Sequence, residues 1–284
     1  MSRVLIVGAG LTGSLCACLL RREMQNKVQI VVWDKARGSG GRMSTSRPPD
    51  PSSHSADLGA QYITTTPAYA QSHHSFYSEL LSSGVLQPLD CLVEGLKQRD
   101  GSRDYMTPLG MCSVVKHFLS ESGADLFFEH HVTGLYRRGA SWEVRRKAGG
   151  SETFDAVVLT MPVPQILQLQ GDVGHNAPGR GPSLVVHTSV PFGLKHLEED
   201  KEDVQPIILQ ELHKLLPGLP QPISIKCQKW RYSQVLTSVP DCPGQMTVLD
   251  CPPLVCGGDA FSHSNFDGCV ESALSMLRVL KASL

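Results

Sequence analysis

The stretch Arg3-Val4-Leu5-Ile6-Val7-Gly8-Ala9-Gly10-Leu11-Thr12-Gly13 decides the fold of this chain. A short apolar run leads into three glycines, and residues 11–22 then carry leucines at helical spacing. Residues 28–33, Val-Gln-Ile-Val-Val-Trp, predict a second buried strand. Strand, glycine turn, helix and strand within about thirty residues form a βαβ unit with parallel strands. The sequence therefore predicts an α/β fold whose parallel sheet carries helices on both faces.

The three glycines have separate tasks in a turn that binds phosphate. Gly8 permits the tight turn, Gly10 lets the backbone approach a pyrophosphate, and Gly13 allows close packing of helix and strand. The first N–H groups of the helix then point at the phosphates. A glycine-rich turn with no ligand is the alternative, since such turns are common in α/β proteins. We expect four residues of this turn to contact a dinucleotide: Gly8, Gly10, Thr12 and Gly13.

Asp34 closes the second predicted strand, 21 positions after Gly13. A carboxylate at this place accepts hydrogen bonds from the ribose of an adenosine, and the alternative is a surface aspartate at a strand end. Because the carboxylate would repel a 2′-phosphate, Asp34 favours FAD or NAD over NADP as the tightly held dinucleotide.

The next segment favours FAD over NAD. Gly38-Ser39-Gly40-Gly41-Arg42-Met43 follows directly and resembles the GGR box of the FAD-dependent amine oxidase superfamily. Its glycines allow a returning loop to lie against the pyrophosphate, where Arg42 can offset the negative charge. A flexible loop with a solvated arginine is the alternative. The resemblance adds Gly41 and Arg42 to the expected cofactor contacts and implies a Rossmann-like FAD-binding domain.

Three further segments resemble this superfamily in the expected order. Residues 56–63, Ala-Asp-Leu-Gly-Ala-Gln-Tyr-Ile, resemble the part that runs beside the flavin ring, which implies that Gln61 and Tyr62 are flavin neighbours. Val132 resembles the backbone contact to adenine. Gly257-Gly258-Asp259 resembles the C-terminal box, where Asp259 would hold the ribityl or pyrophosphate part. The helix that begins near Asn265 would aim its N-terminus at the flavin N1–C2=O edge.

Four more segments resemble one branch of this superfamily, at residues 57–64, 159–164, 216–222 and 264–269. That resemblance implies oxidation of isomeric, non-β forms of NAD(P)H to β-NAD(P)⁺, with electrons passing through FAD to O₂ and giving H₂O₂. The expected partners are therefore a small dihydronicotinamide and O₂. The alternatives are a catecholamine (amine) oxidase and a catalytically impaired form that acts by binding proteins, because the relatives carry extra elements where this chain has a linker.

The sequence assigns no catalytic residue. A dihydronicotinamide needs no protein base to release hydride, and the chain shows no clear acid–base constellation. Tyr62 and Phe266 are the aromatic pair that we expect to face substrate, with plain core residues as the alternative. The adjacent histidines 73–74 and 130–131 point to different sides of a helix or strand, so we predict no metal site. No cysteine motif of the covalently flavinylated relatives precedes the last helix, so we expect non-covalent FAD.

The resemblance implies two lobes. We expect a discontinuous FAD-binding domain of residues 1–70, 105–165 and 241–284. We expect a smaller, truncated α+β substrate domain of residues 71–104 and 183–240, after a Gly/Pro-rich linker at 170–182. Locally, the patterns predict one amphipathic helix over 69–86, a helix over 204–216, and a hairpin that pairs residues 142–144 with a strand at 154–159.

Composition limits the classes of partner. Charged residues make up 19% of the 284 residues and the net charge is −1, which favours neither nucleic acid nor an anionic membrane surface. No apolar stretch is long enough to span a bilayer. Glycines interrupt the N-terminal apolar run, and the nine cysteines show no CxxC pair, so we expect a cytoplasmic protein. Secretion is the alternative that the resemblance implies, and the oligomeric state stays open.

Overall fold

The computed structural model describes residues 1–46, 55–91, 100–166, 169, 186, 188–215, 225, 227–229, 235, 237–241 and 243–283. The predicted linker at 170–182 lies outside the described residues, as does the segment at 216–222.

A six-stranded sheet forms the centre of the molecule, with β1 inside it. Its strand order is β11 (Gln245–Leu249), β12 (Leu254–Gly257), β10 (Ala156–Leu159), β1 (Ser2–Val7), β2 (Val28–Trp33) and β6 (Asp125–Phe127). Every neighbouring pair is parallel except β11 with β12. This sheet confirms the predicted α/β class, and it places the glycine turn after β1 at the carboxyl end of the parallel strands.

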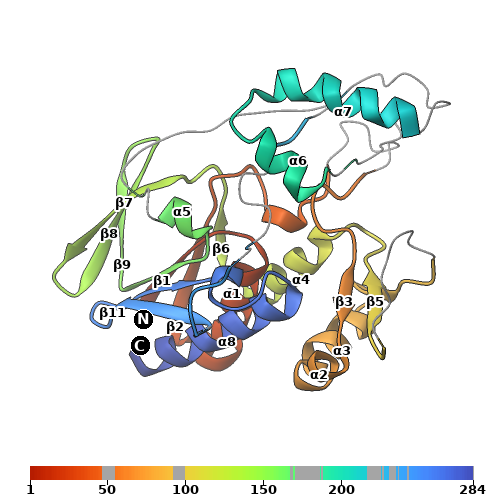
Figure 1. Cartoon of the computed structure of the whole chain (residues 1–284). Coiled ribbons are helices and arrows are strands. Elements are labelled where there is room, and N and C mark those ends of the chain that lie inside the picture. The colour runs from red at the N-terminus through yellow and green to blue at the C-terminus, as the bar shows by residue number, and fades with distance from the viewer. Residues whose placement is uncertain are drawn as a thin grey trace.

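The two faces of the sheet are covered differently (Figure 1). Val4 and Ile6 of β1 pack with three helices, α1 (Leu11–Met24), α4 (Cys112–Ser122) and α8 (Phe266–Ser283). Leu5 and Val7 point the other way, because successive side chains alternate along a strand. Their face meets a three-stranded antiparallel sheet, β7 (Val132–Arg138), β8 (Ser141–Arg146) and β9 (Ser151–Phe154), rather than a second layer of helices.

The predicted hairpin differs from the observed one in its second strand. β8 pairs with β9, and residues 156–159 belong instead to β10 of the central sheet. The chain changes sheets at Asp155, whose carboxylate accepts the Arg3 N–H at 2.8 Å while its own N–H donates to the Arg3 carbonyl at 2.9 Å. These bonds between Asp155 and the start of β1 explain why one apolar run forms two strands.

The helix predicted over 69–86 is also two elements. α2 (Pro67–Ser72) and α3 (His74–Ser82) meet at His73, whose backbone leaves the helical region with φ −109° and ψ 23°. The His73 ring turns to Asp267 of α8, a partner that a local pattern does not show. A small sheet of β3 (Ile63–Thr65), β5 (Arg103–Met106) and β4 (Gln87–Pro88) lies beside these helices.

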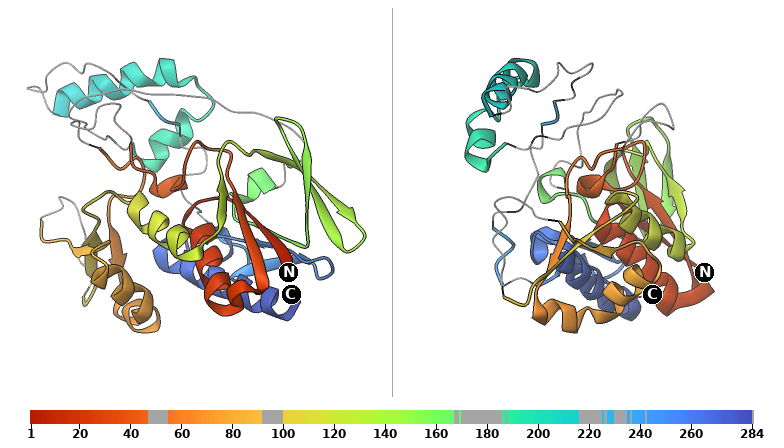
Figure 2. Two further views of the ribbon diagram at one scale, coloured as in Figure 1. Left: turned by 180° about the vertical axis from the view of Figure 1, so that it is seen from behind. Right: turned by 90° about the vertical axis from the view of Figure 1, so that its right-hand side faces the viewer.

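Two further helices lie at one end of the molecule. α6 (Val190–Lys195) and α7 (Lys201–Leu215) stand above the central sheet in Figure 1 and stay at that end in both views of Figure 2. α7 confirms the helix predicted over 204–216. A short helix, α5 (Val163–Ile166), follows β10. Within the described ranges, no helix is both long enough and apolar enough to cross a membrane.

Candidate functional site

The turn after β1 has the geometry that its glycines predict. Gly8 has φ +119°, a backbone conformation that favours glycine, and its N–H donates to the Trp33 carbonyl at 2.8 Å. A Cβ at Gly13 would overlap the Gly8 carbonyl oxygen. Gly8 and Gly13 therefore let α1 start directly against the end of β1.

The N-terminus of α1 is open to an anion. Gly10 is its N-cap, no side chain caps the first turn, and that turn has no acidic residue. A Cβ at Gly10 would meet no atom within 4 Å apart from the neighbouring residues in the chain, so the space directly beside the Gly10 Cα is open. Thr12 is buried in the first turn. N–H groups without intrahelical partners at a helix start suit a phosphate, so the chain fits a pyrophosphate here.

Asp34 ties the glycine turn to the end of β2. Its Oδ2 accepts the Ala9 N–H at 2.7 Å, and its Oδ1 accepts the Ala36 N–H at 2.7 Å. Each carboxylate oxygen has a second lone pair that can still accept a ribose hydroxyl. Asp34 thus supports the turn, a role that the motif did not predict, in addition to the ribose contact that the motif predicts.

The segment that contains Val132 lies next to Asp34. The His130 N–H donates to the Asp34 carbonyl at 2.9 Å, and the Glu129 N–H donates to the Ala36 carbonyl at 2.9 Å. Val132 then starts β7 and is buried. The structure therefore brings the predicted ribose and adenine contacts together, although they are almost a hundred positions apart in the chain.

The second glycine box packs on the first. The Gly40 N–H donates to the Ala9 carbonyl at 2.9 Å, and a Cβ at Gly41 would lie 3.6 Å from the Gly10 Cα. Gly41 has φ +55° and opens a 3₁₀ turn, Gly41–Met43. This close approach places the returning loop where the pyrophosphate is expected.

Arg42 and Asp259 form the main charged pair of the site. Arg42 Nη1 and Nη2 donate to Asp259 Oδ2 and Oδ1 at 2.7 and 2.6 Å, and the Ser264 hydroxyl also donates to Asp259 at 2.7 Å. Burial raises the pKa of Asp259, but the hydrogen bonds and charge of Arg42 lower it by more, so that the pKa of this carboxyl lies below its usual range. The two boxes are thus joined by an ion pair that motif matching did not predict.

The residues expected beside the flavin ring lie on the loop before β3. Gln61 is exposed and its Nε2 donates to the Asp57 carbonyl at 2.8 Å, whereas Tyr62 is half-buried. Phe266 is buried, and its ring packs on Tyr77 with centroids 5.3 Å apart. Among the described rings, no aromatic contact joins Tyr62 to Phe266. The surroundings of Phe266 are therefore those of a core residue, which was the alternative to facing substrate.

Asp57 is a structural residue of this site that the sequence did not single out. Its Oδ1 accepts the Thr45 hydroxyl at 2.6 Å and the Met111 N–H at 2.7 Å. It thereby joins the second glycine box to the start of α4. The sequence shows that Asp57 lies in the segment at 56–63, but it does not show which groups bind the Asp57 carboxylate. No group of His, Cys, Asp or Glu side chains in the described part of the chain is arranged to hold a metal ion.

The fold and the joined glycine boxes define an FAD-dependent oxidoreductase with a Rossmann-like core. A family model described as an NAD(P)-binding Rossmann-like domain matches residues 6–80. A crystal structure of a putative protoporphyrinogen oxidase from Exiguobacterium sp. 255-15 superposes with a TM-score of 0.66 over 100% of this chain and 99% of that one, at 13% identity, and shares the fold. Mouse renalase is 43% identical over 99% of each chain. This chain belongs to the renalase family.

The comparison with mouse renalase also shows a difference in length. Their alignment extends over 339 positions, whereas this chain has 284 residues. Mouse renalase therefore has residues at positions where this chain has none.

Proposed function

We propose that the chain binds FAD non-covalently and oxidises isomeric, non-β forms of NAD(P)H to β-NAD(P)⁺. A hydride would pass from the dihydronicotinamide to FAD, and its two electrons would then reduce O₂ to H₂O₂ with two protons, one from the hydride and one from the solvent. Membership of the renalase family supports this reaction. The observation that carries the cofactor assignment is the uncapped start of α1, where Gly41 packs on Gly10, Asp34 accepts the Ala9 N–H, and Arg42 follows Gly41 in the chain.

Each predicted contact has a task that its surroundings support. The start of α1 and the glycines at 10 and 41 would receive the pyrophosphate, and Arg42 would donate to a phosphate oxygen with the guanidinium N–H groups that its pair with Asp259 does not use. Asp34 would accept ribose hydroxyls, and the backbone of Val132 would meet adenine. Gln61 and Tyr62 would lie beside the ring. When bound, FAD supplies a two-electron acceptor that reacts with O₂.

A dihydronicotinamide suits a site without a dedicated base. The lone pair on its ring nitrogen expels hydride, so the protein has only to orient the ring and exclude water. An amine substrate has different requirements, since an aromatic pair around its nitrogen is the usual device. Phe266 is already packed on Tyr77, which favours the dihydronicotinamide.

The state of Cys269 supports non-covalent binding. Its thiol is buried in α8, next to the C-terminal box, and burial together with the charge of Asp259 raises its pKa to about 11. The thiolate, rather than the thiol, is the nucleophile that forms a bond to carbon. Cys269 therefore remains a thiol near neutral pH.

We place the reaction in the cytoplasm, with secretion as the alternative. The N-terminal apolar run forms β1, which pairs with β2 on one side and β10 on the other. Its removal would take away the strand that presents the glycine turn. Fractionation of cells that express the tagged chain, with an antibody against its C-terminal helix, distinguishes the two compartments.

The absorbance spectrum of the purified protein tests the proposal. We expect a yellow protein that isomeric NADH bleaches in the absence of air, with β-NADH as the matched control that bleaches it much more slowly. Readmitted O₂ should restore the colour and yield one H₂O₂ for each substrate oxidised. Denaturation should release all flavin into the supernatant.

Other outcomes contradict parts of the proposal. Bleaching by catecholamines instead would identify an amine oxidase. A folded protein that holds flavin but is silent to both substrate classes would favour the catalytically impaired form that acts by binding proteins. A folded protein that takes up no flavin would overturn the cofactor assignment.

A further inference from the structure

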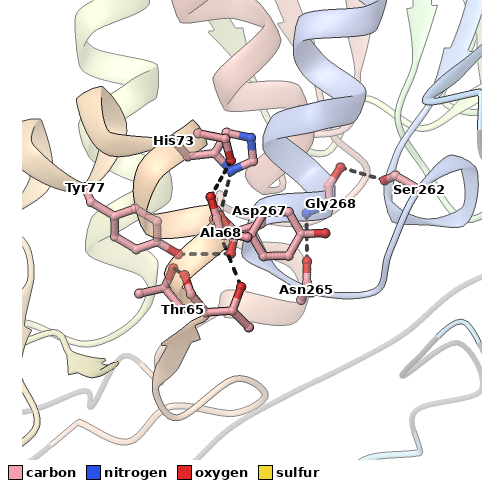
Figure 3. Close-up of polar contacts among 11 residues, drawn as sticks. Thr65, Ala68, His73, Tyr77, Ser262, Asn265, Asp267 and Gly268 are labelled. Atoms are coloured by element: carbon pink, nitrogen blue, oxygen red, sulfur yellow. Dashed lines mark hydrogen bonds and ion pairs between the residues drawn. The ribbon is translucent and has the colours of Figure 1, made fainter. Parts of the chain in front are cut away.

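A buried cluster of polar side chains connects α8 with the break between α2 and α3 (Figure 3). Asp267, in the first turn of α8, is 1% exposed, and its Oδ1 lies 2.7 Å from His73 Nδ1. Its Oδ2 accepts the Tyr77 hydroxyl at 3.1 Å. His73 and Asp267 are 194 residues apart in the chain. The cluster therefore joins two distant segments at the start of a helix.

Both oxygens of this buried carboxylate have donors. A carboxylate out of reach of water is costly unless hydrogen bonds replace its hydration. A carboxylate without a proton only accepts, so opposite such a carboxylate the His73 tautomer that fits is the one with its hydrogen on Nδ1. Burial raises the pKa of Tyr77 and the charge of Asp267 raises it too, so the phenol stays protonated and donates. The carboxylate also lies at the N-terminus of α8, where the helix dipole stabilises a negative charge.

Aromatic packing fixes the two donors. The His73 ring stacks on Tyr69, with centroids 5.5 Å apart and planes 13° apart, and meets Phe76 edge-on at 6.4 Å. Tyr77 packs on Phe266, the residue before Asp267. His73 and Tyr77 are therefore held in one orientation, and a carboxylate bound to them is held as well.

The segment that ends at Asp267 begins in the cofactor site. Asp259 binds Arg42, and Ser264 donates to Asp259. Asn265 then caps α8, because its Oδ1 accepts the Gly268 N–H at 2.7 Å. A Cβ at Gly268 would overlap the His263 carbonyl oxygen, which shows how tightly this turn is packed. Residues 259–268 are thus anchored at one end by Arg42 and at the other by the buried cluster.

We propose that His73 is a positioning residue for the flavin site, which holds Asp267 and thereby fixes the start of α8 and the segment before it. This inference rests on the proposed binding of FAD. Without the Nδ1–H, one oxygen of Asp267 loses its donor, and the first turn of α8 moves toward water to replace it. That movement displaces the turn between Asp259 and α8 from the place where it meets the flavin.

Two substitutions of His73 separate its hydrogen bond from its volume. His73→Phe keeps a ring of similar size and removes the donor, whereas His73→Asn places an amide N–H near the position of Nδ1. His117→Phe is the matched control, since His117 Nε2 lies 2.8 Å from the Glu79 carboxylate, a partner on α3 and not on α8. For each protein we would measure the Kd for FAD by fluorescence titration, and amide exchange of residues 262–272 in the apoprotein.

In His73→Phe we expect faster exchange at Gly268 and Cys269 and a Kd for FAD raised about tenfold. His73→Asn should recover most of both losses, and His117→Phe should change neither. A shift of the midpoint potential of bound flavin in His73→Phe would support a positioning role for His73, because a loss of stability alone would not change that potential. If His73→Phe does not fold, Tyr77→Phe removes only one hydroxyl and should give a smaller rise of Kd.

An unchanged Kd in folded His73→Phe, or in Tyr77→Phe where it stands in, overturns this inference. An equal rise in His117→Phe also overturns it, because the effect would then be general destabilisation. Absence of FAD binding by the unaltered chain overturns the proposed function itself. FAD binding that the His73 variants leave unchanged overturns only the role of His73.

Discussion

Arg42 and Asp259 lie 217 residues apart in sequence and share two hydrogen bonds of 2.7 and 2.6 Å. The Asp259 side chain is 9% exposed and that of Arg42 is 35% exposed. Their geometry is that of a guanidinium fork facing both oxygens of one carboxylate, which is the strongest form of such a pair. The pair holds the second glycine box against the C-terminal box, so the two ends of the cofactor site depend on each other.

Arg42→Lys should weaken FAD binding by about tenfold or more, because a lysine ammonium cannot donate to both carboxylate oxygens and also face a phosphate. Arg22→Lys is the control, since Arg22 makes the same two-fold contact with Glu79, at 2.9 and 2.6 Å, on the helices rather than in the site. Fluorescence titration with FAD measures both variants. Equal affinities in Arg42→Lys and the unaltered chain would falsify the assigned role.

Asp259→Asn should remove a pH-dependent part of the stability. The folded pKa of Asp259 lies below its usual range, since Arg42 outweighs the effect of burial. Its contribution is therefore complete above the unfolded pKa of about 3.9 and is lost as the pH falls through the lower folded value. We expect a loss of about 2 kcal/mol near neutral pH, from a hydrogen-bonded charge pair.

Urea unfolding of both proteins, at a series of pH values from neutral down to about 3, checks this pH dependence. The difference in free energy of unfolding between Asp259→Asn and the unaltered chain should shrink below about pH 4. A difference that stays constant over this range would show that the pair does not set the acid stability.

Gly13→Ala should lower the stability of the protein, whereas Gly10→Ala should lower its affinity for FAD. A Cβ at Gly13 would overlap the Gly8 carbonyl oxygen, so Gly13→Ala should cost about 3 kcal/mol of stability. A Cβ at Gly10 meets nothing, so Gly10→Ala should change stability by less than about 1 kcal/mol. The new methyl would stand where we propose that the pyrophosphate binds, so it should raise the Kd for FAD at least about tenfold. Thermal unfolding of the apoproteins and FAD titration together distinguish the two effects.

Asp34→Ala should reduce both stability and affinity for FAD. The Ala9 and Ala36 N–H groups would lose the Asp34 carboxylate that accepts their hydrogen bonds. The ribose of FAD would lose the carboxylate that we propose accepts its hydroxyls. Asp155→Ala is the control, because Asp155 also accepts a backbone N–H, that of Arg3, at the opposite end of β1. Both variants should lose about 1–3 kcal/mol, but only Asp34→Ala should lose affinity. Similar FAD affinities in the two would contradict the ribose assignment.

Local sequence patterns were sufficient for the centre of the fold. β1, α1 and β2 follow from an apolar run, a glycine turn and leucines at helical spacing, and each requires only neighbours in the chain. The patterns gave wrong bounds for a helix and a strand where a contact with a distant residue determines where the element ends. The helix over 69–86 breaks because His73 meets Asp267, and the strand at 154–159 divides because Asp155 bonds to Arg3.

The candidate site shows the same division. Each expected cofactor contact came from a short motif, and the structure brings the glycine boxes and the segment before Val132 together. Motifs could not show how members of different boxes pair, so the bond between Arg42 and Asp259 was not predicted. Aromatic residues carry still less information, since Phe266 packs on Tyr77 in a way that its type alone does not reveal.

The packing of α1 against both α4 and α8 has a consequence for synthesis on the ribosome. The glycine turn and α1 emerge well before β12 and α8, which lie more than 200 residues further along the chain. Until then α1 lacks one of its two covering helices, Arg42 has no Asp259 and β10 has an open edge. The nascent chain therefore exposes apolar surface that chaperones bind, and the flavin unit closes only once residues 254–283 have left the ribosome.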